Sequence, residues 1–529
     1  MNYKTALCSL LALWVMGSYS DNAARKNSYL AKLTGVPGQG YLLACEIGSN
    51  RQKLHLLLDT GSSNLIVAGS AISGSQKWYN ASQSTTSYNT SKHMTVHYTH
   101  GNISGDIYED IFGLPGLIEG DDLRNTKKFV MNAFVTPLLV VTRETQIFNS
   151  AIQPSLNGII GFAYSELAVQ PPGNQPNMQS IMDNLVKHLE LADQFTTKFC
   201  GSTEAVARSQ GQLKGQPMSA SNLLIKNITV TGTLTLGAEG PTREYQFQTV
   251  PVVEASHFRI VLTDISISGQ SLIQNCKELN SGLTIVDTGT ANIMLPSVVY
   301  RRFKEEVLAH FNQTASALSR SGSDLFRFGA KICQDIGGVD TPFPGDVYAA
   351  FPTVEFDILA QTGPDPRILR LSLSSQQYLR YVGRSNVARA NRDCFTLAVL
   401  ESKNSDLVLG MSFLEGFEVL FNRRDKKVGF RTSDCVSYTQ YPALRNSRVV
   451  GAYQWNSADD KSSAPEDCSP LLVSEQSATS LNALAIILIV FSIFVFFILC
   501  GILVFFLLRR KSKLARVANV DGETNSVSI

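Results

Sequence analysis

The sequence predicts an all-β fold of two related lobes, with a few short helices and one C-terminal transmembrane helix. Short apolar runs separated by Gly, Asn and Ser are typical of strands, and they occur at residues 54–58, 94–98, 232–236, 283–286, 407–409 and 418–421. Helical spacing of apolar residues is clearest at residues 178–191 and recurs at residues 298–311. A segment of the chain that occurs twice indicates two lobes rather than one.

The composition is that of a folded protein without a nucleic-acid partner. The chain has 529 residues, of which 44% are hydrophobic and 17% are charged, and this balance excludes a disordered chain. The formal net charge is +2, so the basic footprint of a nucleic-acid-binding protein is absent. The sequence therefore indicates a globular protein of about two to four domains.

Both ends of the chain are targeting segments. Residues 1–20 carry Lys4 and then a short apolar stretch, which predicts a signal peptide rather than a first transmembrane helix. Residues 483–508 contain no charged residue and exceed the length of about 20 residues that a bilayer requires. A basic run at residues 509–511 follows directly, which disfavours a buried core helix and places residues 509–529 in the cytoplasm. We therefore expect a single-pass type I membrane protein of the secretory pathway, endosome or cell surface.

The region between these ends divides by composition. Residues 21–37 form a short N-terminal segment, and residues 38–206 and 207–435 form the two lobes. Residues 436–482 lose the strand pattern and become polar, which predicts a stalk, although Cys468 suggests that part of it is tied to the core.

Cysteine usage fits an oxidising compartment, where disulfides form. The cysteines before the transmembrane segment are Cys45, Cys200, Cys276, Cys333, Cys394, Cys435 and Cys468. Their odd number leaves at least one thiol over. Cys45 lies in an apolar stretch, so we expect it to be a buried free thiol, and the sequence by itself does not choose among the pairings of the others.

The most informative feature is an internal repeat. Residues 56–64, LLLDTGSSN, recur as residues 284–292, TIVDTGTAN. A second echo follows each copy, as NGIIG at residues 157–161 and LVLG at residues 407–410. Two lobes with the same loop and the same closing strand explain both echoes. Two ordinary hairpin turns would explain neither the echoes nor the apolar strand that leads into each loop.

The repeated loop carries a specific chemistry. Asp59 and Asp287 each follow an apolar strand, and facing each other would allow them to share one proton. One carboxyl group can then take a proton from water while the other hydrogen-bonds a substrate carbonyl. The neighbouring loop residues fit supporting roles: a tight turn at the glycines, hydrogen bonds to the carboxylates from the next residues, and bonds across to the opposite loop from the threonines. These residues are Gly61 and Gly289, Ser62 and Thr290, and Thr60 and Thr288.

On these motifs the chain resembles the pepsin-like aspartic proteases over about residues 38–435. The flap tyrosine of that family has its counterpart in Tyr98, within VHYTHG at residues 96–101. The membrane anchor narrows the resemblance to the beta-secretase (memapsin) branch. Four further segments look like that branch: GQGY at 38–41, NCKE at 275–278, SQQYLR at 375–380 and EGF at 415–417.

The resemblance implies a bilobal pepsin-like fold and a membrane-anchored aspartic endopeptidase. Its substrates would be luminal or extracellular polypeptides, mainly membrane proteins, and neither a metal nor another cofactor is expected. The implied disulfides are Cys200–Cys435, Cys276–Cys468 and Cys333–Cys394, which leave Cys45 over. The alternative is a non-catalytic binding or adhesion protein of the same fold, which would be expected to lose an aspartate, a loop glycine or Tyr98. This chain has them all.

Other features of the sequence carry weaker expectations. His93, His97 and His100 surround Tyr98, and we interpret His93 and His97 as a solvent-facing polar strand face rather than a metal site. The C-terminal Val527-Ser528-Ile529 fits a PDZ-type groove. N-glycosylation is expected at sequons, which lie at Asn80, Asn89, Asn102, Asn227 and Asn312.

Overall fold

The structure is a computed structural model, and the residues it describes all belong to one compact unit of the chain. It describes residues 27–72, 75–98, 101–120, 127–145, 147–148, 155–171, 178–202, 229–237, 246–314, 326, 330–335, 345–363, 365–387, 390–435, 447–455 and 465–468. The expected signal peptide, transmembrane segment and cytoplasmic tail lie outside these residues, as do His100 and Asn227. Within the described ranges, no helix combines the length and the apolar character that crossing a membrane requires.

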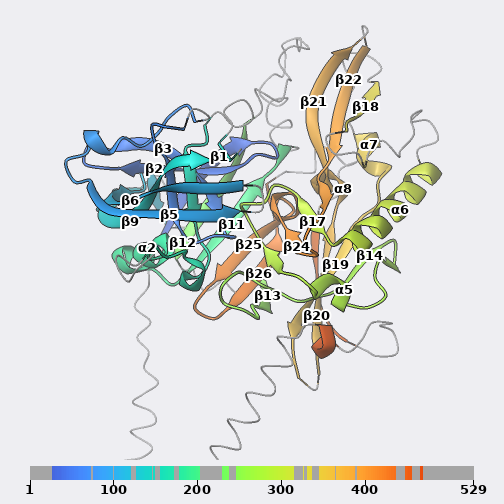
Figure 1. The fold of residues 1–529 in the computed structure, drawn as a ribbon. Helices are drawn as coiled ribbons and strands as arrows, with labels where there is room; N and C mark the ends of the chain where they lie inside the picture. Colours follow the sequence, from blue (N-terminus) through green and yellow to red (C-terminus); the bar gives the residue numbers. More distant parts are fainter. Residues whose placement is uncertain are drawn as a thin grey trace, which may run out of the picture. The chain divides into compact units, whose positions relative to one another are not determined.

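The fold is mostly β, as the sequence predicts, and one large sheet runs through it (Figure 1). In order across this sheet the strands are β13 (Gln248–Pro251), β26 (Lys427–Thr432), β25 (Phe417–Asn422), β11 (Gln194–Cys200), β12 (Val230–Gly237), β1 (Ser28–Val36), β2 (Gly40–Ile47), β3 (Gln52–Asp59), β10 (Gly158–Gly161), β4 (Leu65–Ala68), β9 (Phe134–Glu144), β6 (Gly101–Gly113) and β5 (Tyr88–Tyr98). Strands β7 (Leu117–Glu119) and β8 (Lys128–Phe129) pair at the side of β1. The order joins strands from both halves of the chain, since β11 pairs with β25.

Smaller sheets build most of the second half of the chain. One contains β15 (Gln270–Ser271), β14 (Leu262–Ile267), β19 (Val354–Gln361), β20 (Arg367–Leu373) and β27 (Arg448–Gln454). Another contains β16 (Thr284–Val286), β24 (Leu407–Leu409), β17 (Ile293–Leu295) and β23 (Val399–Glu401). A third contains β18 (Ile332–Asp335), β22 (Ala390–Leu397) and β21 (Leu379–Val387).

Helices are few and short, and the two that the sequence predicts are present. They are α2 (Ile181–Leu189) and α6 (Ser297–Thr314). The side chain of Ser180 caps α2 by accepting a hydrogen bond from the amide of Met182. Helix α6 buries Val299, Phe303 and Val307, which are spaced four residues apart and therefore share one face. The other helices among the described residues are α5 (Lys277–Asn280), α7 (Gly345–Ala349), α8 (Ser375–Tyr378) and α9 (Met411–Leu414), with 3₁₀ turns η1 (Ala81–Gln83), η2 (Ser165–Leu167) and η7 (Pro465–Cys468).

The internal repeat of the sequence is also a repeat of the topology. Strand β10, which contains the first echo, pairs parallel with β3 and antiparallel with β4. Strand β24, which contains the second echo, pairs parallel with β16 and antiparallel with β17. The strand that ends in Asp59 and the strand that leads into Asp287 are therefore held by the same pattern of neighbours.

Two of the segment boundaries expected from the sequence need correction. Residues 28–36, assigned to a short segment ahead of the first lobe, form β1, which pairs with β12 along eight residues and also with β2. Residues 448–454, assigned to the stalk, form β27, which pairs with β20 at the edge of a sheet. Both strands mix apolar and polar residues, and their pairing depends on partners far away in the sequence. Composition alone therefore did not reveal them.

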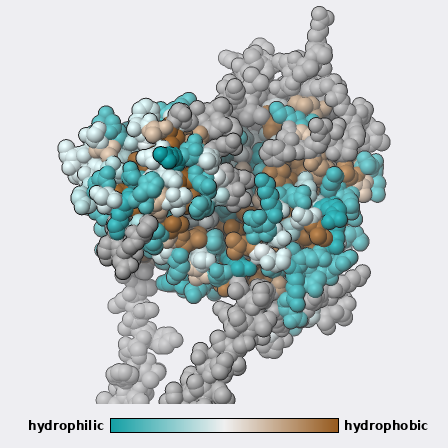
Figure 2. Space-filling model, viewed as in Figure 1, coloured by the Kyte–Doolittle hydropathy of each residue, from teal (hydrophilic) through white to brown (hydrophobic). Residues whose placement is uncertain are grey.

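Aromatic side chains fill the core where the two halves of the chain meet. The rings of Phe195 and Phe421 stack with their centroids 4.9 Å apart, and Phe258 packs edge-on against Phe421 at 4.7 Å. Tyr164 lies 5.0 Å from Phe258. On the face drawn in Figure 2, hydrophilic residues cover most of the described surface and apolar residues gather toward its middle. The burial of the aromatic rings of Phe195, Phe258, Phe421 and Tyr164 stabilises the core where the two halves of the chain meet.

Three disulfides close the fold, and they are the pairs that the resemblance implies: Cys200–Cys435, Cys276–Cys468 and Cys333–Cys394. Cys276–Cys468 attaches the segment after β27 to the start of α5. Cys45 is a buried free thiol, as expected. Burial raises the pKa of the Cys45 thiol, so it stays protonated and unreactive.

Candidate active site

The two repeated loops bring Asp59 and Asp287 together at the ends of buried strands. Asp59 is the last residue of β3, and Asp287 follows β16 directly. The two side chains are 6% and 7% exposed. A carboxylate in such a place is costly unless it is hydrogen-bonded or protonated, so the surroundings of both groups decide what they can do.

The hydrogen bonds around the two carboxylates mirror each other. The amide of Gly61 donates to Oδ1 of Asp59 at 2.9 Å, and the amide of Gly289 donates to Oδ1 of Asp287 at 2.8 Å. The hydroxyl of Ser62 donates to Oδ2 of Asp59, and that of Thr290 donates to Oδ2 of Asp287. Each carboxylate therefore has both oxygens oriented by its own loop.

Burial raises the pKa of the Asp59 carboxyl, and the negative charge of Asp287 raises it further. The hydrogen bonds from Ser62 and Gly61 act in the opposite direction, because they favour the ionised form. The raised pKa of Asp59 favours its protonated form. The arrangement suits one carboxyl that donates a proton and one carboxylate that accepts one.

Glycine is required beside each carboxylate by the closeness of the opposite loop. A Cβ atom on Gly61 would lie 2.8 Å from Oδ1 of Asp287, and one on Gly289 would lie 2.2 Å from Oδ1 of Asp59. Both distances are below any normal contact of a Cβ atom. The glycines therefore allow the two carboxyl groups to approach each other across the loops.

The carboxyl groups lie in a cleft with a volume of about 490 Å³. The side of the cleft built from the first half of the chain is largely apolar and includes Leu57, Val96, Ile147, Leu156, Ile159, Leu167 and Val169. The side built from the second half adds His257, Leu283, Ile285, Asp406 and Val408. A cleft of this size and lining can hold an extended segment of polypeptide.

Tyr98 lies over this cleft at the end of β5, as the resemblance predicts for the flap. Its hydroxyl oxygen is buried and lies near the hydroxyl of Ser62, which opposes the rise of its pKa. Burial, followed by the charge of Asp59, raises the pKa of Tyr98 and keeps the phenol protonated. A protonated phenol that lines the cleft can donate a hydrogen bond to a ligand.

The histidines next to Tyr98 that the structure describes belong to the outer face of the hairpin. His93 and His97 are exposed, while Met94 and Val96 between them are buried. His93 pairs with Asp106 at 3.0 Å, and Nδ1 of His97 lies 2.8 Å from Oδ1 of Asn102. Both side chains thus have hydrogen-bond partners within the hairpin.

The described sequons lie on the surface, where glycosylation remains a prediction. Asn89, Asn102 and Asn312 are exposed, and Asn80 is half-buried at the start of η1.

Sequence reasoning missed two polar residues of the cleft, His257 and Asp406. Nδ1 of His257 lies 3.1 Å from the hydroxyl of Ser256, and burial lowers the pKa of His257 although the charge of Asp287 opposes this. Asp406 accepts a hydrogen bond from the amide of Leu283, the residue just before β16, which leads into Asp287. No motif marks either residue, so only their position in the fold reveals them.

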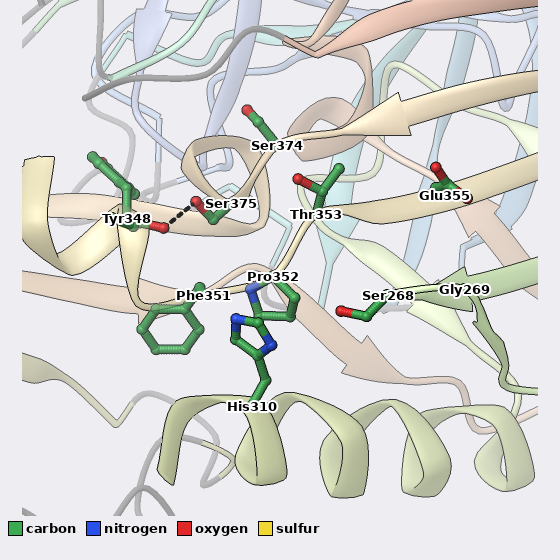
Figure 3. Close-up of a pocket in the computed structure, with 11 residues that line it drawn as sticks. Ser268, Gly269, His310, Tyr348, Phe351, Pro352, Thr353, Glu355, Ser374 and Ser375 are labelled. Carbon is green, nitrogen blue, oxygen red and sulfur yellow. Dashed lines mark hydrogen bonds between the residues drawn. The ribbon is translucent and has the colours of Figure 1, made fainter. Parts of the chain in front are cut away.

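A second cavity, of about 370 Å³, lies between α6 and the ends of β14 and β19 (Figure 3). Figure 3 shows His310 of α6 pointing toward Pro352, with Ser268 and Glu355 to the right of them in this view. It shares none of its lining residues with the cleft that holds the aspartates.

Comparison with known proteins agrees with this geometry. The chain matches the family model of eukaryotic aspartyl protease over residues 40–433. It is similar to a beta-secretase of Strongylocentrotus purpuratus, with 28% identity over 406 residues that cover 76% of this chain and 68% of that protein. It is also similar to cathepsin E of Rattus norvegicus, with 25% identity over 274 residues that cover 50% of this chain and 56% of that protein. An embryonic pepsinogen of Gallus gallus is 22% identical over 315 residues, which cover 58% and 68% of the two chains.

The fold and this match place the protein in the eukaryotic aspartyl protease family. It is an aspartic endopeptidase, and its substrates are polypeptides.

Proposed function

We propose that the protein is a membrane-anchored endopeptidase in which Asp59 and Asp287 activate a water molecule. The observation that carries this proposal is the mirrored set of hydrogen bonds around two carboxyl groups at the floor of one cleft. One carboxylate takes a proton from water, and the water oxygen attacks the carbonyl carbon of the scissile peptide bond. The protonated carboxyl group hydrogen-bonds the carbonyl oxygen and stabilises the charge that develops there. The tetrahedral intermediate then breaks its C–N bond as the carboxyl group that took the proton from water returns it to the leaving nitrogen.

The flap is proposed to close over the substrate and to exclude water from the reacting centre. Tyr98 supports this role, because it lines the same cleft and its buried hydroxyl lies near Ser62, which donates a hydrogen bond to Asp59. We expect the Tyr98→Phe variant to fold as stably as the wild type but to cleave peptides with a lower kcat/KM. A wild-type kcat/KM in that variant would show that the hydroxyl does not act on the substrate.

We further propose that the protease acts on membrane proteins at the luminal or extracellular side of the secretory pathway. The charge-free residues 483–508, followed by basic residues, support a membrane anchor. Similarity to a beta-secretase supports a secretory protease. An anchored enzyme meets anchored substrates at a raised effective concentration.

The catalytic assignment is tested with Asp59→Asn and Asp287→Asn in the full-length protein. Each variant is expected to remain folded and to lose cleavage of a quenched peptide between pH 3 and 7. The double variant is expected to be little worse than either single one, because the pair acts as a unit. A single variant with most of the wild-type rate would refute the assignment.

The anchor is tested separately by comparing the full-length protein with a form that ends at residue 482. Both forms are expected to cleave soluble peptides equally well, and the truncated form is expected to cleave membrane-bound substrates more slowly in cells. Equal cleavage of membrane substrates by both forms would contradict the role of the anchor.

A further inference from the structure

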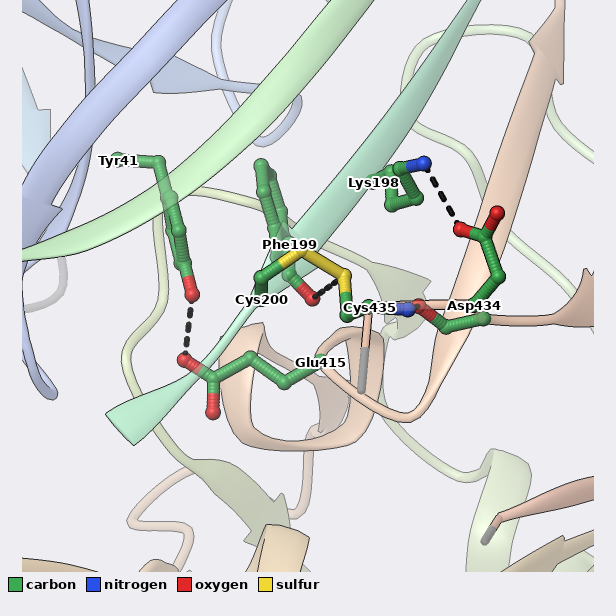
Figure 4. Close-up of a disulfide and its surroundings, with 8 residues drawn as sticks. Tyr41, Lys198, Phe199, Cys200, Glu415, Asp434 and Cys435 are labelled. Atoms are coloured by element: carbon green, nitrogen blue, oxygen red, sulfur yellow. Dashed lines mark hydrogen bonds and ion pairs between the residues drawn. A yellow bond between two sulfur atoms is a disulfide. The ribbon is translucent and has the colours of Figure 1, made fainter. Parts of the chain in front are cut away.

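Three of the motifs that carry the resemblance take no direct part in the chemistry of the aspartates, yet they meet in the fold. GQGY at residues 38–41 leads into β2, SQQYLR at residues 375–380 spans α8 and the start of β21, and EGF at residues 415–417 joins α9 to β25. The hydroxyl of Tyr41 donates to Oε1 of Glu415 at 2.9 Å (Figure 4).

Arg380 is the third member of this cluster and is 8% exposed. Glu415 is the main charge that favours its ionised form, and Arg380 in turn lowers the pKa of Glu415 against the effect of burial. A Cβ atom on Gly38 would lie 2.4 Å from Nη1 of Arg380, so the loop before β2 lies directly against the guanidinium.

The guanidinium of Arg380 holds the loop that carries Asp287. Nη2 donates to the carbonyl oxygen of Ala291 at 2.8 Å, and Nη1 donates to Oδ1 of Asn292 at 3.1 Å. Ala291 and Asn292 follow the Asp-Thr-Gly-Thr run of this loop directly. The planar fork of an arginine fixes two acceptors at once, which a lysine does not do.

The matching loop around Asp59 is held in another way. Asn64 occupies the position that corresponds to Asn292, and its side chain bonds to both the amide and the carbonyl of Val169, at 3.0 and 3.1 Å. The asparagine that ends each loop is thus anchored to a partner far away in the sequence. The loop of Asp59 is held by the backbone of Val169, and the loop of Asp287 is held by the buried guanidinium of Arg380.

The stability of the fold does not explain why the charged side chain of Arg380 is buried here. Burial lowers the pKa of Arg380, and its Nε atom is buried with no hydrogen-bond partner among the described residues. Buried charge pairs are often no more stable than apolar side chains of the same volume, while they do restrict geometry. The cluster also includes rigid neighbours: Tyr41 stacks on Phe199 with ring centroids 4.1 Å apart, and Figure 4 shows the disulfide of Cys200 next to Glu415.

We propose that Arg380 is a positioning residue for Asp287: through its hydrogen bonds to Ala291 and Asn292 it fixes the second aspartate loop at the distance from Asp59 that proton sharing requires. This role rests on the proposed function of Asp59 and Asp287. The loop before β2 and the turn after α9 would then both influence the separation of Asp59 from Asp287. Displacing a reacting group by about 1 Å can lower the rate about 100-fold.

The main test is the variant Arg380→Met combined with Glu415→Gln in the full-length protein. The pair of changes avoids leaving one buried charge alone, so folding is expected to be retained. We expect kcat for a quenched peptide to fall about 10- to 100-fold with little change in KM. The upper limb of the pH–rate profile is expected to shift to lower pH, because carboxyl groups that lie farther apart titrate closer to their ordinary pKa values. A double variant that folds and keeps the wild-type kcat and pH profile would overturn the proposal.

A second variant tests the same link without altering any charge. Asn292→Ala removes the acceptor of Nη1, and we expect a lower kcat and the same direction of the pH shift. Combined with the Arg380 change, its effect should be less than additive, because both remove one interaction. An unchanged kcat in Asn292→Ala, or full additivity of the two changes, would count against positioning through this contact.

Arg423→Met is the matched control. Arg423 is also buried and pairs with Asp183 and Asp193, and among the described residues its guanidinium makes no hydrogen bond or ion pair with either aspartate loop. It should lower the unfolding temperature and leave kcat per folded molecule and the pH profile unchanged. If it shifts the pH profile as the Arg380 variant does, general destabilisation explains both and the proposal fails. Activity that survives in Asp287→Asn would instead refute the catalytic role of Asp59 and Asp287, whatever the result for Arg380.

Discussion

Thr60 and Thr288 exchange reciprocal hydrogen bonds across the two aspartate loops. The amide of Thr60 donates to Oγ1 of Thr288 at 3.0 Å, and the amide of Thr288 donates to Oγ1 of Thr60 at 2.9 Å. Each hydroxyl also donates onward, to the carbonyl oxygens of Val286 and Leu58 respectively. The two loops are therefore joined by four hydrogen bonds between buried groups, which restricts the separation of Asp59 from Asp287.

The first prediction concerns the hydrogen bonds between the two aspartate loops. Thr60→Val keeps the shape of the side chain but leaves the amide of Thr288 buried without an acceptor, which costs about 1–3 kcal/mol. We expect a lower unfolding temperature and a kcat about 10-fold or more below the wild type, because the loops lose their fixed spacing. Thr60→Ser retains the hydroxyl and should behave nearly as the wild type. Equal activity of the Val and Ser variants in a peptide-cleavage assay would contradict the role of the bonds.

The second prediction concerns the glycine beside Asp59. A Cβ atom at position 289 would lie 2.2 Å from Oδ1 of Asp59, so Gly289→Ala must displace that carboxyl group or its own loop. We expect cleavage to fall at least 100-fold, with only a moderate loss of stability. Gly113→Ala is the control, because a Cβ atom there would meet its nearest neighbours at 3.8 and 3.9 Å. Substantial activity in Gly289→Ala, measured against Gly113→Ala, would show that the carboxyl groups tolerate a wider separation.

Local patterns in the sequence predict the active-site loops because the information is local. The strand, the aspartate, the glycine and the hydroxyl residue lie within nine residues in each repeat, and the structure places them together as expected. The repeat also predicts the shared topology of β10 and β24.

Features that depend on distant partners were not predictable in this way. Strand β1 needs β12, about 200 residues later, to become an internal strand. Arg380 reaches Asn292 from 88 residues away, and Tyr41 reaches Glu415 from 374 residues away. Asp406 enters the cleft because β24 lies beside β16, and His257 enters it because the residues after it bond to β16, where Arg259 forms a bridge with Ile285. Sequence motifs named the residues around Arg380, but only the fold shows that they touch.

The third prediction concerns the dependence of stability on pH. The pKa of Asp59 is raised in the folded state by burial first and by Asp287 second. Above the unfolded-state pKa of about 3.9, the folded protein therefore binds more protons at this site than the unfolded chain does. Stability from this site is largest at acidic pH and is lost as the pH rises through the folded-state pKa.

Asp59→Asn removes this dependence. We expect the variant to be more stable than the wild type at neutral pH, by about 1.4 kcal/mol for each unit by which the pKa is raised. At pH 3 to 4 the difference should largely vanish, because the carboxyl group is then protonated in both states. Urea unfolding of both proteins at several pH values measures the effect. A wild type that is equally or more stable than Asp59→Asn at pH 7 would contradict the raised pKa.

The last prediction concerns how the N-terminus is processed. Strand β1 pairs with β12 on one side and with β2 and β7 on the other, and it buries Tyr29, Leu30 and Leu33. Gly40 begins β2 only four residues after β1 ends, so the segment between them is too short to supply a replacement strand. Residues 28–36 must therefore remain in the active enzyme, and any cleavage that matures the N-terminus must lie before them.

Two truncated forms test this, each placed behind a signal peptide and otherwise full length. A chain that begins at Asn27 is expected to be exported and to cleave peptides at the wild-type rate. A chain that begins at Gly38 loses the buried strand and leaves the backbone of β12 and β2 without a partner, so it should be retained in the cell without activity. If the form that begins at Gly38 is secreted and active, β1 is dispensable, and its removal during maturation becomes possible again.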